Sequence, residues 1–298
     1  MTTMTARPDE LLELPPRTSE FRRFLRVFLG RKIVILGSTI ILALIIVAIF
    51  APFIAPFDPY RQNLRETLQQ PSGKYLLGTD PLGRDVLSRI IYGSRVSLMV
   101  GLVSVGIAGC IGMSLGLLAG YFGGLADMLI MRFIDALMSI PPLMLAIAIG
   151  AALGGGLTNV MISLGIALIP TYARLMRGQV LTVKQSDYVI AGEVVGGSDL
   201  RIMLVHVFPN CLSPLIVLVT LNLGYAILAE AGLSFLGLGI SPPGAAWGAM
   251  VNDGYRYLLT NPILSFAPGF CVMLVVLAFN LVGDGLRDAL DPRLRGTI

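Results

Sequence analysis

Residues able to carry catalytic or metal chemistry are few in this sequence. His206 is the only histidine, so a metal site built from several histidines is excluded. The three cysteines, Cys110, Cys211 and Cys271, lie inside or beside apolar runs and have no C-x-x-C spacing. An odd number of cysteines in this pattern argues against a disulfide framework or a zinc site. We therefore interpret all three as small packing residues.

Two common motifs for phosphate binding and metal-assisted hydrolysis are also missing. The sequence contains no G-x-x-x-x-G-K-[ST] loop that could cradle ATP phosphates and no H-E-x-x-H pair for zinc. We expect a chain that is not an enzyme and that binds no cofactor of its own. If its function needs ATP, another protein must then hydrolyse it.

Composition places the chain in a membrane. Of its 298 residues, 55% are hydrophobic and 13% are charged, and its mean hydropathy is +0.80. Soluble domains carry about 25% charged residues. The net charge of +4 is small, and the basic residues flank apolar runs. We interpret these residues as determinants of membrane orientation, so lipids are the expected surroundings and nucleic acid is not an expected partner.

Six stretches are apolar enough to be membrane spans, since about 20 such residues cross a bilayer. The predicted spans are residues 33–57, 96–126, 131–153, 160–175, 211–229 and 263–283. Basic residues between Arg22 and Lys32 precede the first span and place the N-terminus in the cytoplasm. We predict an all-α polytopic membrane protein with six transmembrane helices and both termini cytoplasmic.

The spans divide the chain into a membrane core and polar segments. An amphipathic surface helix over residues 21–29 is an alternative within the N-terminal tail. The predicted segments are a cytoplasmic tail (1–32), an external loop (58–95), the core of spans two to six (96–283) with its cytoplasmic loop (176–209), and a cytoplasmic C-terminal tail (284–298).

Spacing predicts how some spans pack and bend. Gly112, Gly116 and Gly120 lie four residues apart, which allows another helix to approach closely. Pro141-Pro142 predicts a kink in the third span. Arg132 and Asp135 are three residues apart and can pair on a helix.

Charged and aromatic residues near the outer side are candidates for function. Asp80, Arg84 and Asp85 could serve a gate or a partner, although a solvated loop with local ion pairs explains them as well. Glu230 ends an apolar run, and a carboxylate at mid-membrane costs a few kcal/mol. A position in a solute path and a position at the interface both fit Glu230. We interpret Trp247, the only tryptophan, as an interfacial anchor.

One polar stretch, Lys184–Asn210, interrupts the apolar runs and is called the polar island below. Ser186-Asp187 predicts a helix start, and Gly196-Gly197 predicts its end. Ser198-Asp199 then predicts a second short helix, and Pro209 marks either its end or a kink into the next span. A capped and hinged helical pair beside a membrane is shaped to fit a partner protein.

The polar island resembles the cytoplasmic signature loop of ABC-importer permeases, E-A-A, three residues, G, nine residues, I-x-L-P. The aligned residues are Ile190-Ala191-Gly192, Gly196 and His206-Val207-Phe208-Pro209, followed by Asn210. The spacing matches throughout, but Ile190, Gly192 and His206 depart from the pattern. The departure at Ile190 leaves no glutamate to act at that position.

Longer stretches resemble the dipeptide/oligopeptide/nickel permease family in its second, C-type, subunit. They are LGTDPLGRDVLSRIIYGSRVSL (77–98), AGYFGG (119–124), AGLSFLGLGISPP (231–243) with Trp247-Gly248, and LAFNLVGDGLRDALDPR (277–293). The resemblance covers the chain from about residue 20, with the signatures in the same order. It implies a type I ABC importer permease (MetI-like) fold in a bacterial cytoplasmic (inner) membrane.

The resemblance also implies partners and substrates. A second homologous permease, two ABC ATPase subunits that use ATP and Mg²⁺, and an external or periplasmic solute-binding protein would complete the complex. Substrates of the family include dipeptides, oligopeptides, glutathione, opine-like compounds and nickel complexes. An ion-coupled secondary transporter and an assembly protein without transport are the rival interpretations, and the former usually needs ionisable groups in its spans, which are scarce here.

The resemblance assigns roles to individual residues. Coupling to the ATPase is expected of Asp187, Tyr188, Ala191, Gly192, Gly196, Asp199, His206 and Pro209. An external gate or a binding-protein face is expected of Asp80, Arg84 and Asp85. Glu230 is a candidate for the translocation path.

Overall fold

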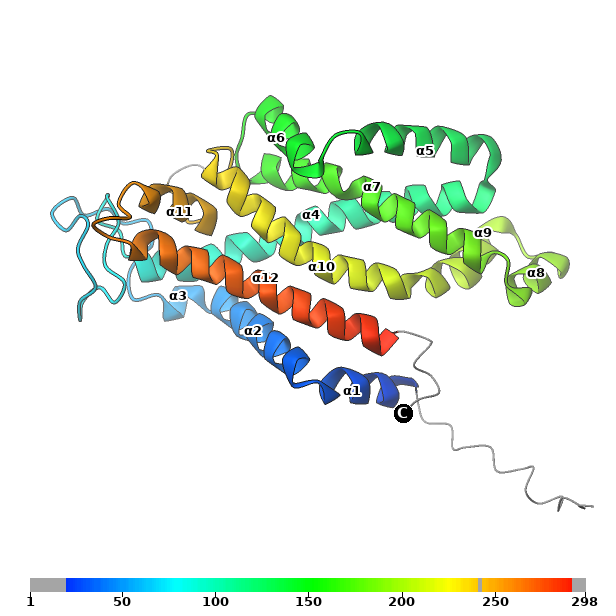
Figure 1. The fold of residues 1–298 in the computed structure, drawn as a ribbon, viewed down its shortest axis with the longest axis horizontal. Helices are drawn as coiled ribbons and strands as arrows, with labels where there is room; N and C mark the ends of the chain where they lie inside the picture. Colours follow the sequence, from blue (N-terminus) through cyan, green and yellow to red (C-terminus); the bar gives the residue numbers. More distant parts are fainter. Residues whose placement is uncertain (1–19, 241–242, 291–298) are drawn as a thin grey trace, which may run out of the picture.

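The chain folds as an elongated bundle of helices (Figure 1). The computed structural model describes residues 20–240 and 243–290, and the regular elements within these ranges are helices, including one π-helical turn, η2. The helices are α1 Glu20–Gly30, α2 Lys32–Ile49, α3 Ala51–Ile54, α4 Val86–Phe122, α5 Gly124–Met138, α6 Pro142–Leu153, α7 Leu157–Val183, α8 Asp187–Val194, α9 Asp199–Arg201, η2 Ile202–Val207, α10 Phe208–Phe235, α11 Trp247–Tyr255 and α12 Ile263–Leu290. The prediction of an all-α membrane chain is confirmed.

The described residues contain five helices that are long and apolar enough to cross a membrane, or six if the bent pair α5–α6 counts as one span. The five are α2, α4, α7, α12 and the continuous helical stretch Asp199–Phe235. In Figure 1, α4, α7, α10 and α12 run along the long axis of the molecule. Helix α4 begins at Val86, well before the uncharged run that starts at Val96.

A sharp bend of 87° separates α5 from α6 where the sequence predicts a kink. Pro141 has extended backbone (φ −54°, ψ 135°), and Pro142 is the first residue of α6. Proline lacks an N–H donor and keeps the preceding residue out of the helical conformation, so the helix cannot continue through the pair. The position of the break is confirmed, and whether the bent pair α5–α6 forms a single span, as predicted for residues 131–153, stays a prediction.

The glycine stripe on α4 packs against α7, as its spacing predicts. A Cβ atom added at Gly112 would lie 2.6 Å from the Ile169 carbonyl oxygen, and one at Gly120 would lie 2.8 Å from the Val180 Cβ atom. Such separations are too short for real carbon contacts, so only glycine allows this approach of the two backbones. Helices α4 and α7 thereby form a closely packed pair.

Gly112 and Gly116 of this stripe, with Ser114 between them, also match the hydrolase motif G-x-S-x-G. In hydrolases this serine stands on a strand-to-helix turn that exposes its hydroxyl. Ser114 instead lies in the middle of α4, and its Oγ donates to the Cys110 carbonyl oxygen at 2.7 Å. The motif therefore arises from helix packing and offers no nucleophile.

Two ion pairs fasten α5 to α7. Arg177 donates to both carboxylate oxygens of Asp127, at 2.5 and 2.6 Å. Arg174 donates to Asp135 at 2.6 Å. The pairing of Asp135 with Arg132, which the sequence suggests, is wrong because Arg174 on the neighbouring helix takes that place.

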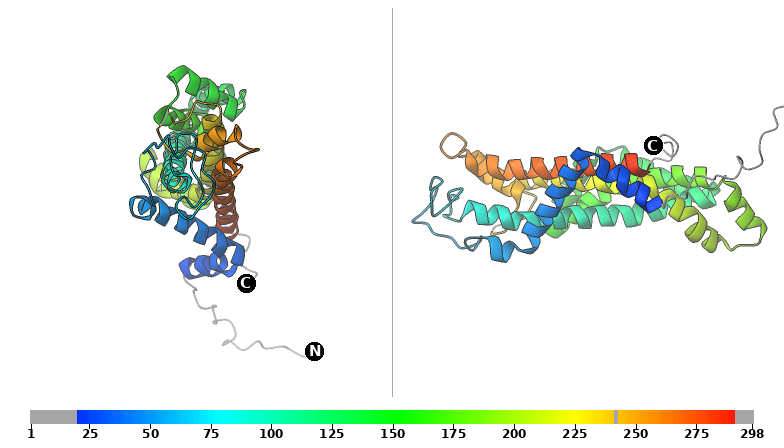
Figure 2. Two further views of the ribbon diagram at one scale, coloured as in Figure 1. Left: turned by 90° about the vertical axis from the view of Figure 1, so that its left-hand side faces the viewer. Right: turned by 90° about the horizontal axis from the view of Figure 1, so that it is seen from below.

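The two ends of the described chain lie together. Arg31, between α1 and α2, forms an ion pair with Asp288 in the last turns of α12. Figure 2 shows α1 beside the end of α12. A helix at residues 20–30 agrees with the alternative of a helix over 21–29, while the remainder of the two tails, residues 1–19 and 291–298, lies outside the described residues.

Candidate functional site

The first candidate site is the polar island at one end of the bundle (Figure 1). Helix α8 starts after Ser186, whose backbone is extended (φ −78°, ψ 142°), and Asp187 lies in its first turn. It ends where Gly196 adopts φ +86°, a conformation that glycine takes readily. The Gly197 N–H then donates to the Gly192 carbonyl oxygen at 3.0 Å. The predicted helix, glycine hinge and helix restart are confirmed, although the Ser186 side chain makes no cap hydrogen bond with the described residues.

The second helix of the island does not end at Pro209. The chain is helical from Asp199 through η2 into α10, and Pro209 lies in the first turn of α10. Because proline has no N–H, it cannot close a hydrogen bond to the preceding turn, and the wide π turn Ile202–Val207 lies directly before it. Of the two predicted alternatives, a distortion at the entry to the span fits and a separate helix end does not.

Four of the predicted coupling residues surround one groove, which we call the island groove. Its volume is about 770 Å³, and its lining includes Ala191, Gly192, Gly196, Arg201 and His206. The sequence interpretation did not include Arg201, which lies in the first turn of the continuous helical stretch that begins at Asp199.

The other four predicted coupling residues are not part of the lining of the island groove. Tyr188 and Pro209 contribute to a second groove, between α7, α10 and α12. Asp187 and Asp199 are exposed at the starts of α8 and α9.

Helix α8 has one buried anchor and an exposed apolar tip. Val189 is completely buried in the cluster that also contains Ile202. Val194 and Val195 at the tip are 80% and 87% exposed. An apolar tip on a short helix that is held from below offers a partner surface to bury.

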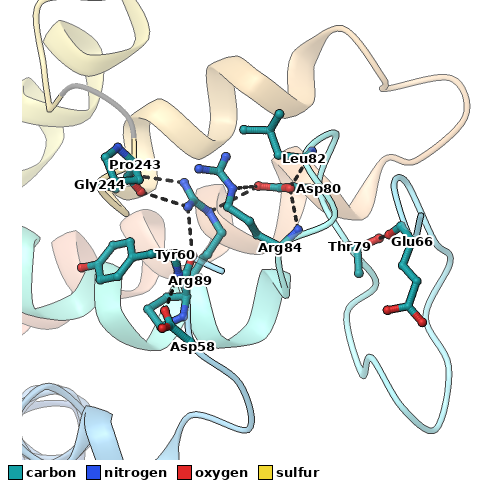
Figure 3. A network of polar contacts seen from close by, with 11 residues as sticks. Asp58, Tyr60, Glu66, Thr79, Asp80, Leu82, Arg84, Arg89, Pro243 and Gly244 are labelled. Atoms are coloured by element: carbon teal, nitrogen blue, oxygen red, sulfur yellow. Dashed lines mark hydrogen bonds and ion pairs between the residues drawn. The ribbon is translucent and has the colours of Figure 1, made fainter. Parts of the chain in front are cut away.

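The second candidate site, at the opposite end, contains the predicted outer charges, and Figure 3 shows two of them, Asp80 and Arg84. Asp80, Arg84 and Asp85 are only 7%, 3% and 3% exposed, so the interpretation of a solvated loop is wrong. Arg84 Nε donates to Asp80 Oδ2 at 2.6 Å, which confirms a local ion pair. Asp85 caps α4 by accepting hydrogen bonds from the backbone N–H and the hydroxyl of Ser88, at 2.8 and 2.6 Å.

Arg89 is the centre of this second site, and the sequence analysis missed it. Its side chain is 2% exposed and donates to the carbonyl oxygens of Pro59, Pro243 and Gly244, at 3.2, 3.3 and 3.2 Å (Figure 3). Its Nε atom lies 3.6 Å from the Asp80 carboxylate. Arginine provides five donors in one plane, so a single side chain can hold three carbonyl groups from two backbone segments. We call residues 58–89 and 243–262 the polar cap.

Trp247 belongs to the polar cap and is not an interfacial anchor. It is buried, and its indole Nε1 donates to the Ile90 carbonyl oxygen at 2.9 Å. Its ring lies where a side chain at Gly93 would be, because a Cβ atom there would be 2.6 Å from the Trp247 Cδ1 atom. The bulky ring thus fixes α11 against α4.

Glu230 lies in the interior of the chain and not on an open face. It is 1% exposed, and its Oε1 accepts a hydrogen bond from the Ser234 hydroxyl at 2.5 Å. Its Oε2 has no hydrogen-bond partner among the described residues. A role in a solute path remains a prediction.

Comparisons with known proteins agree with this arrangement. Residues 112–296 match the family model "Binding-protein-dependent transport system inner membrane component", and residues 19–71 match "N-terminal TM domain of oligopeptide transport permease C". The inward-facing MetNI methionine ABC transporter has a similar fold, with a TM-score of 0.55 and 18% identity over 68% of this chain and 96% of that chain.

Several relatives are similar over nearly their whole length. The di/tripeptide permease DppC of Pseudomonas aeruginosa is 45% identical over 93% of both chains. The dipeptide permease DppC of Haemophilus influenzae is 41% identical over 96% of this chain and 99% of that one. The glutathione permease GsiD of Pectobacterium atrosepticum is 42% identical over 92% of both chains. The chain therefore belongs to the family of binding-protein-dependent transport system inner membrane components and is a permease subunit of the dipeptide/oligopeptide ABC importer type.

Proposed function

We propose that this chain pairs with a second, homologous permease in a bacterial cytoplasmic (inner) membrane and that the two together form the path of a solute. Two ATPase subunits on the cytoplasmic side use ATP and Mg²⁺, and an external solute-binding protein delivers the solute. The description of the family, which names binding-protein dependence and the inner membrane, supports this assembly.

The polar island is the proposed contact with the ATPase. The observation that carries this assignment is the exposed apolar tip of α8, Val194-Val195, above the buried anchor Val189. A partner cleft that covers the tip would gain apolar contacts, and the island groove gives it a concave surface to fill. An ATPase whose two states bind α8 differently can shift the permease between two conformations.

The proposed solutes are short peptides or peptide-like compounds. Relatives at 41–45% identity are named for the transport of di- and tripeptides, dipeptides and glutathione. The resemblance leaves opine-like compounds and nickel complexes as further candidates. In this assembly the external binding protein largely sets the choice among them.

The polar cap is the proposed outer face, on the opposite side from the polar island. Basic residues before α2 support a cytoplasmic position for the island end. Asp80, Arg84 and Asp85 then act by holding the shape of the cap, since their side chains are buried. Glu230 stays a candidate for the translocation path in a conformation that exposes it.

The hinge at Gly196 provides the test. The complex of both permeases, ATPases and binding protein is purified, reconstituted into vesicles and assayed for ATP-driven uptake of dipeptides and glutathione. Gly196→Val places a β-branched residue at φ +86°, which costs on the order of 1–2 kcal/mol. We expect uptake and solute-stimulated ATP hydrolysis to fall about tenfold, while membrane insertion stays normal.

Gly196→Asn is the matched control, because asparagine tolerates the left-handed conformation and nothing lies within 4 Å of a Cβ atom there. It should retain most of the uptake. Normal coupling in Gly196→Val would contradict the hinge assignment. Uptake by this chain alone, driven by an ion gradient, would favour a secondary transporter instead.

A further inference from the structure

Tyr121 lies where three segments meet, at the end of α4. Its side chain is 4% exposed, and its hydroxyl donates to Asp199 Oδ1 at 3.0 Å. Lys184 Nζ donates to the Tyr121 carbonyl oxygen at 2.7 Å, and it lies 5.0 Å from the centroid of the Tyr121 ring. The cation is therefore held both by a hydrogen bond and by the face of the ring.

These two contacts fix both stems of α8. Lys184 follows α7 and precedes α8, whereas Asp199 starts α9 on the other side of the glycine hinge. One residue of α4 thus holds the segment that leads into α8 and the segment that leads out of it. Since α8 lies between two fixed stems, a force on its tip is transferred to α4.

The ring and the hydroxyl of Tyr121 have separate partners. The ring packs in the buried cluster that contains Met176, Val180 and Val189. The hydroxyl makes its hydrogen bond to Asp199, which is otherwise exposed. Replacing tyrosine with phenylalanine therefore removes the link to α9 and leaves the ring in its packing position.

Helix α4 can carry such a displacement to the polar cap. It is continuous from Val86 to Phe122, and its glycine stripe keeps it against α7. Near its first residues, Arg89 holds the carbonyl groups of the cap. A helix held at both ends moves as one body, so its two ends are mechanically linked.

We propose that Tyr121 is a positioning residue for coupling, which fastens both stems of α8 to α4 through its hydroxyl group and its carbonyl group. This inference rests on the proposed function of the polar island. It assigns to a residue outside the island the step in which movement of α8 becomes movement of a membrane helix.

A double-mutant cycle on the hydroxyl link tests this proposal. Tyr121→Phe, Asp199→Ala and the double variant are reconstituted as full complexes and assayed for dipeptide uptake per ATP hydrolysed. We expect Tyr121→Phe to lower this ratio roughly fivefold, which corresponds to about 1 kcal/mol, while assembly and ATP hydrolysis are retained. Asp199→Ala should lower the uptake per ATP hydrolysed by a similar factor. The double variant should lower it no further than either single variant does.

Two variants separate the hydrogen bond from other effects. Asp199→Asn keeps an acceptor for the Tyr121 hydroxyl and should retain most of the wild-type uptake per ATP hydrolysed. Tyr225→Phe removes an exposed hydroxyl of α10 that makes no hydrogen bond to the described residues, and it should change nothing. Independent effects of Tyr121→Phe and Asp199→Ala, or an equal loss of hydrolysis and uptake, would overturn the proposal.

A spin label at the exposed position Val194 gives a readout that does not depend on transport. Tyr121→Phe should increase the mobility of this label, and Tyr225→Phe should not. Unchanged mobility would refute the link even in an active complex. A wild-type complex without ATP-driven uptake would instead refute the proposed function together with the coupling role, whatever the label shows.

Discussion

The polar cap depends on one buried side chain, and replacing Arg89 with methionine tests this dependence. Methionine keeps much of the length and apolar volume of arginine but removes the three donors to Pro59, Pro243 and Gly244. It also removes the cation 3.6 Å from Asp80. Removing one partner of a buried ion pair lowers the free energy of unfolding by about 3–5 kcal/mol. We expect the lower value, because Asp80 keeps Arg84 as a partner.

A loss of about 3 kcal/mol should be visible in thermal unfolding. For chains of about 150–250 residues, 1 kcal/mol shifts Tm by about 2–4 °C, so the expected shift is about 6–12 °C for the purified complex. Limited proteolysis gives a local readout, since release of residues 58–85 should expose new cleavage sites there. Arg89→Lys should give an intermediate shift, because an ammonium group cannot reach three carbonyl groups in the plane of a guanidinium.

Arg95→Met is the matched control on the same helix. Arg95 is exposed and lies over the Tyr92 ring at 6.0 Å, so its loss should change stability by less than about 0.5 kcal/mol. If Arg89→Met shifts Tm no more than Arg95→Met and leaves the proteolysis of residues 58–85 unchanged, Arg89 does not organise the cap.

Two further substitutions test packing and pH dependence. Gly112→Ala places a Cβ atom 2.6 Å from the Ile169 carbonyl oxygen and should lower the free energy of unfolding by about 1–3 kcal/mol in thermal unfolding. Gly178→Ala is the control on α7, where a Cβ atom meets open space, and should be neutral or slightly stabilising. Equal effects of the two substitutions would contradict close packing of α4 against α7. The hydrogen bond from Lys74 lowers the pKa of Glu66. The stabilisation that the ionised Glu66 carboxylate provides is therefore fully present above its unfolded-state pKa of about 4.3, and it is lost as the pH falls through its lower pKa in the folded protein. Glu66→Gln should abolish the loss of hydrogen-exchange protection that residues 58–85 show as the pH falls through this range. An unchanged loss of protection in the variant would contradict the pairing of Glu66 with Lys74.

Local patterns predicted those features that depend on neighbours in the sequence. The four-residue spacing of Gly112, Gly116 and Gly120 predicted a close helix contact, and Gly196-Gly197 predicted the end of α8. Pro141-Pro142 predicted where the chain bends. The backbone conformation of glycine or proline decides the end of α8 and the bend, whereas the stripe acts because glycine has no side chain to keep α7 at a distance.

The polar cap could not be predicted in this way because its contacts join distant parts of the chain. Arg89 binds the carbonyl groups of Pro243 and Gly244, which are 154 and 155 residues away. Burial of Asp80 likewise depends on this packing, so its local sequence looks like that of a solvated loop. Trp247 was assigned to the interface for the same reason, since nothing near it in the sequence shows that Gly93 leaves room for its ring.

In the coupling that we propose, the length of α4 links the two candidate sites. Its 37 residues extend for about 55 Å, which exceeds the roughly 30 Å hydrocarbon core of a bilayer. Polar contacts hold each end of this long helix: Arg89 on one side and Tyr121 with Lys184 on the other. Between these anchors the close contact with α7 resists bending. In the proposed mechanism, a helix of this kind would transmit displacement between the polar island and the polar cap more directly than a chain of separate side-chain contacts could.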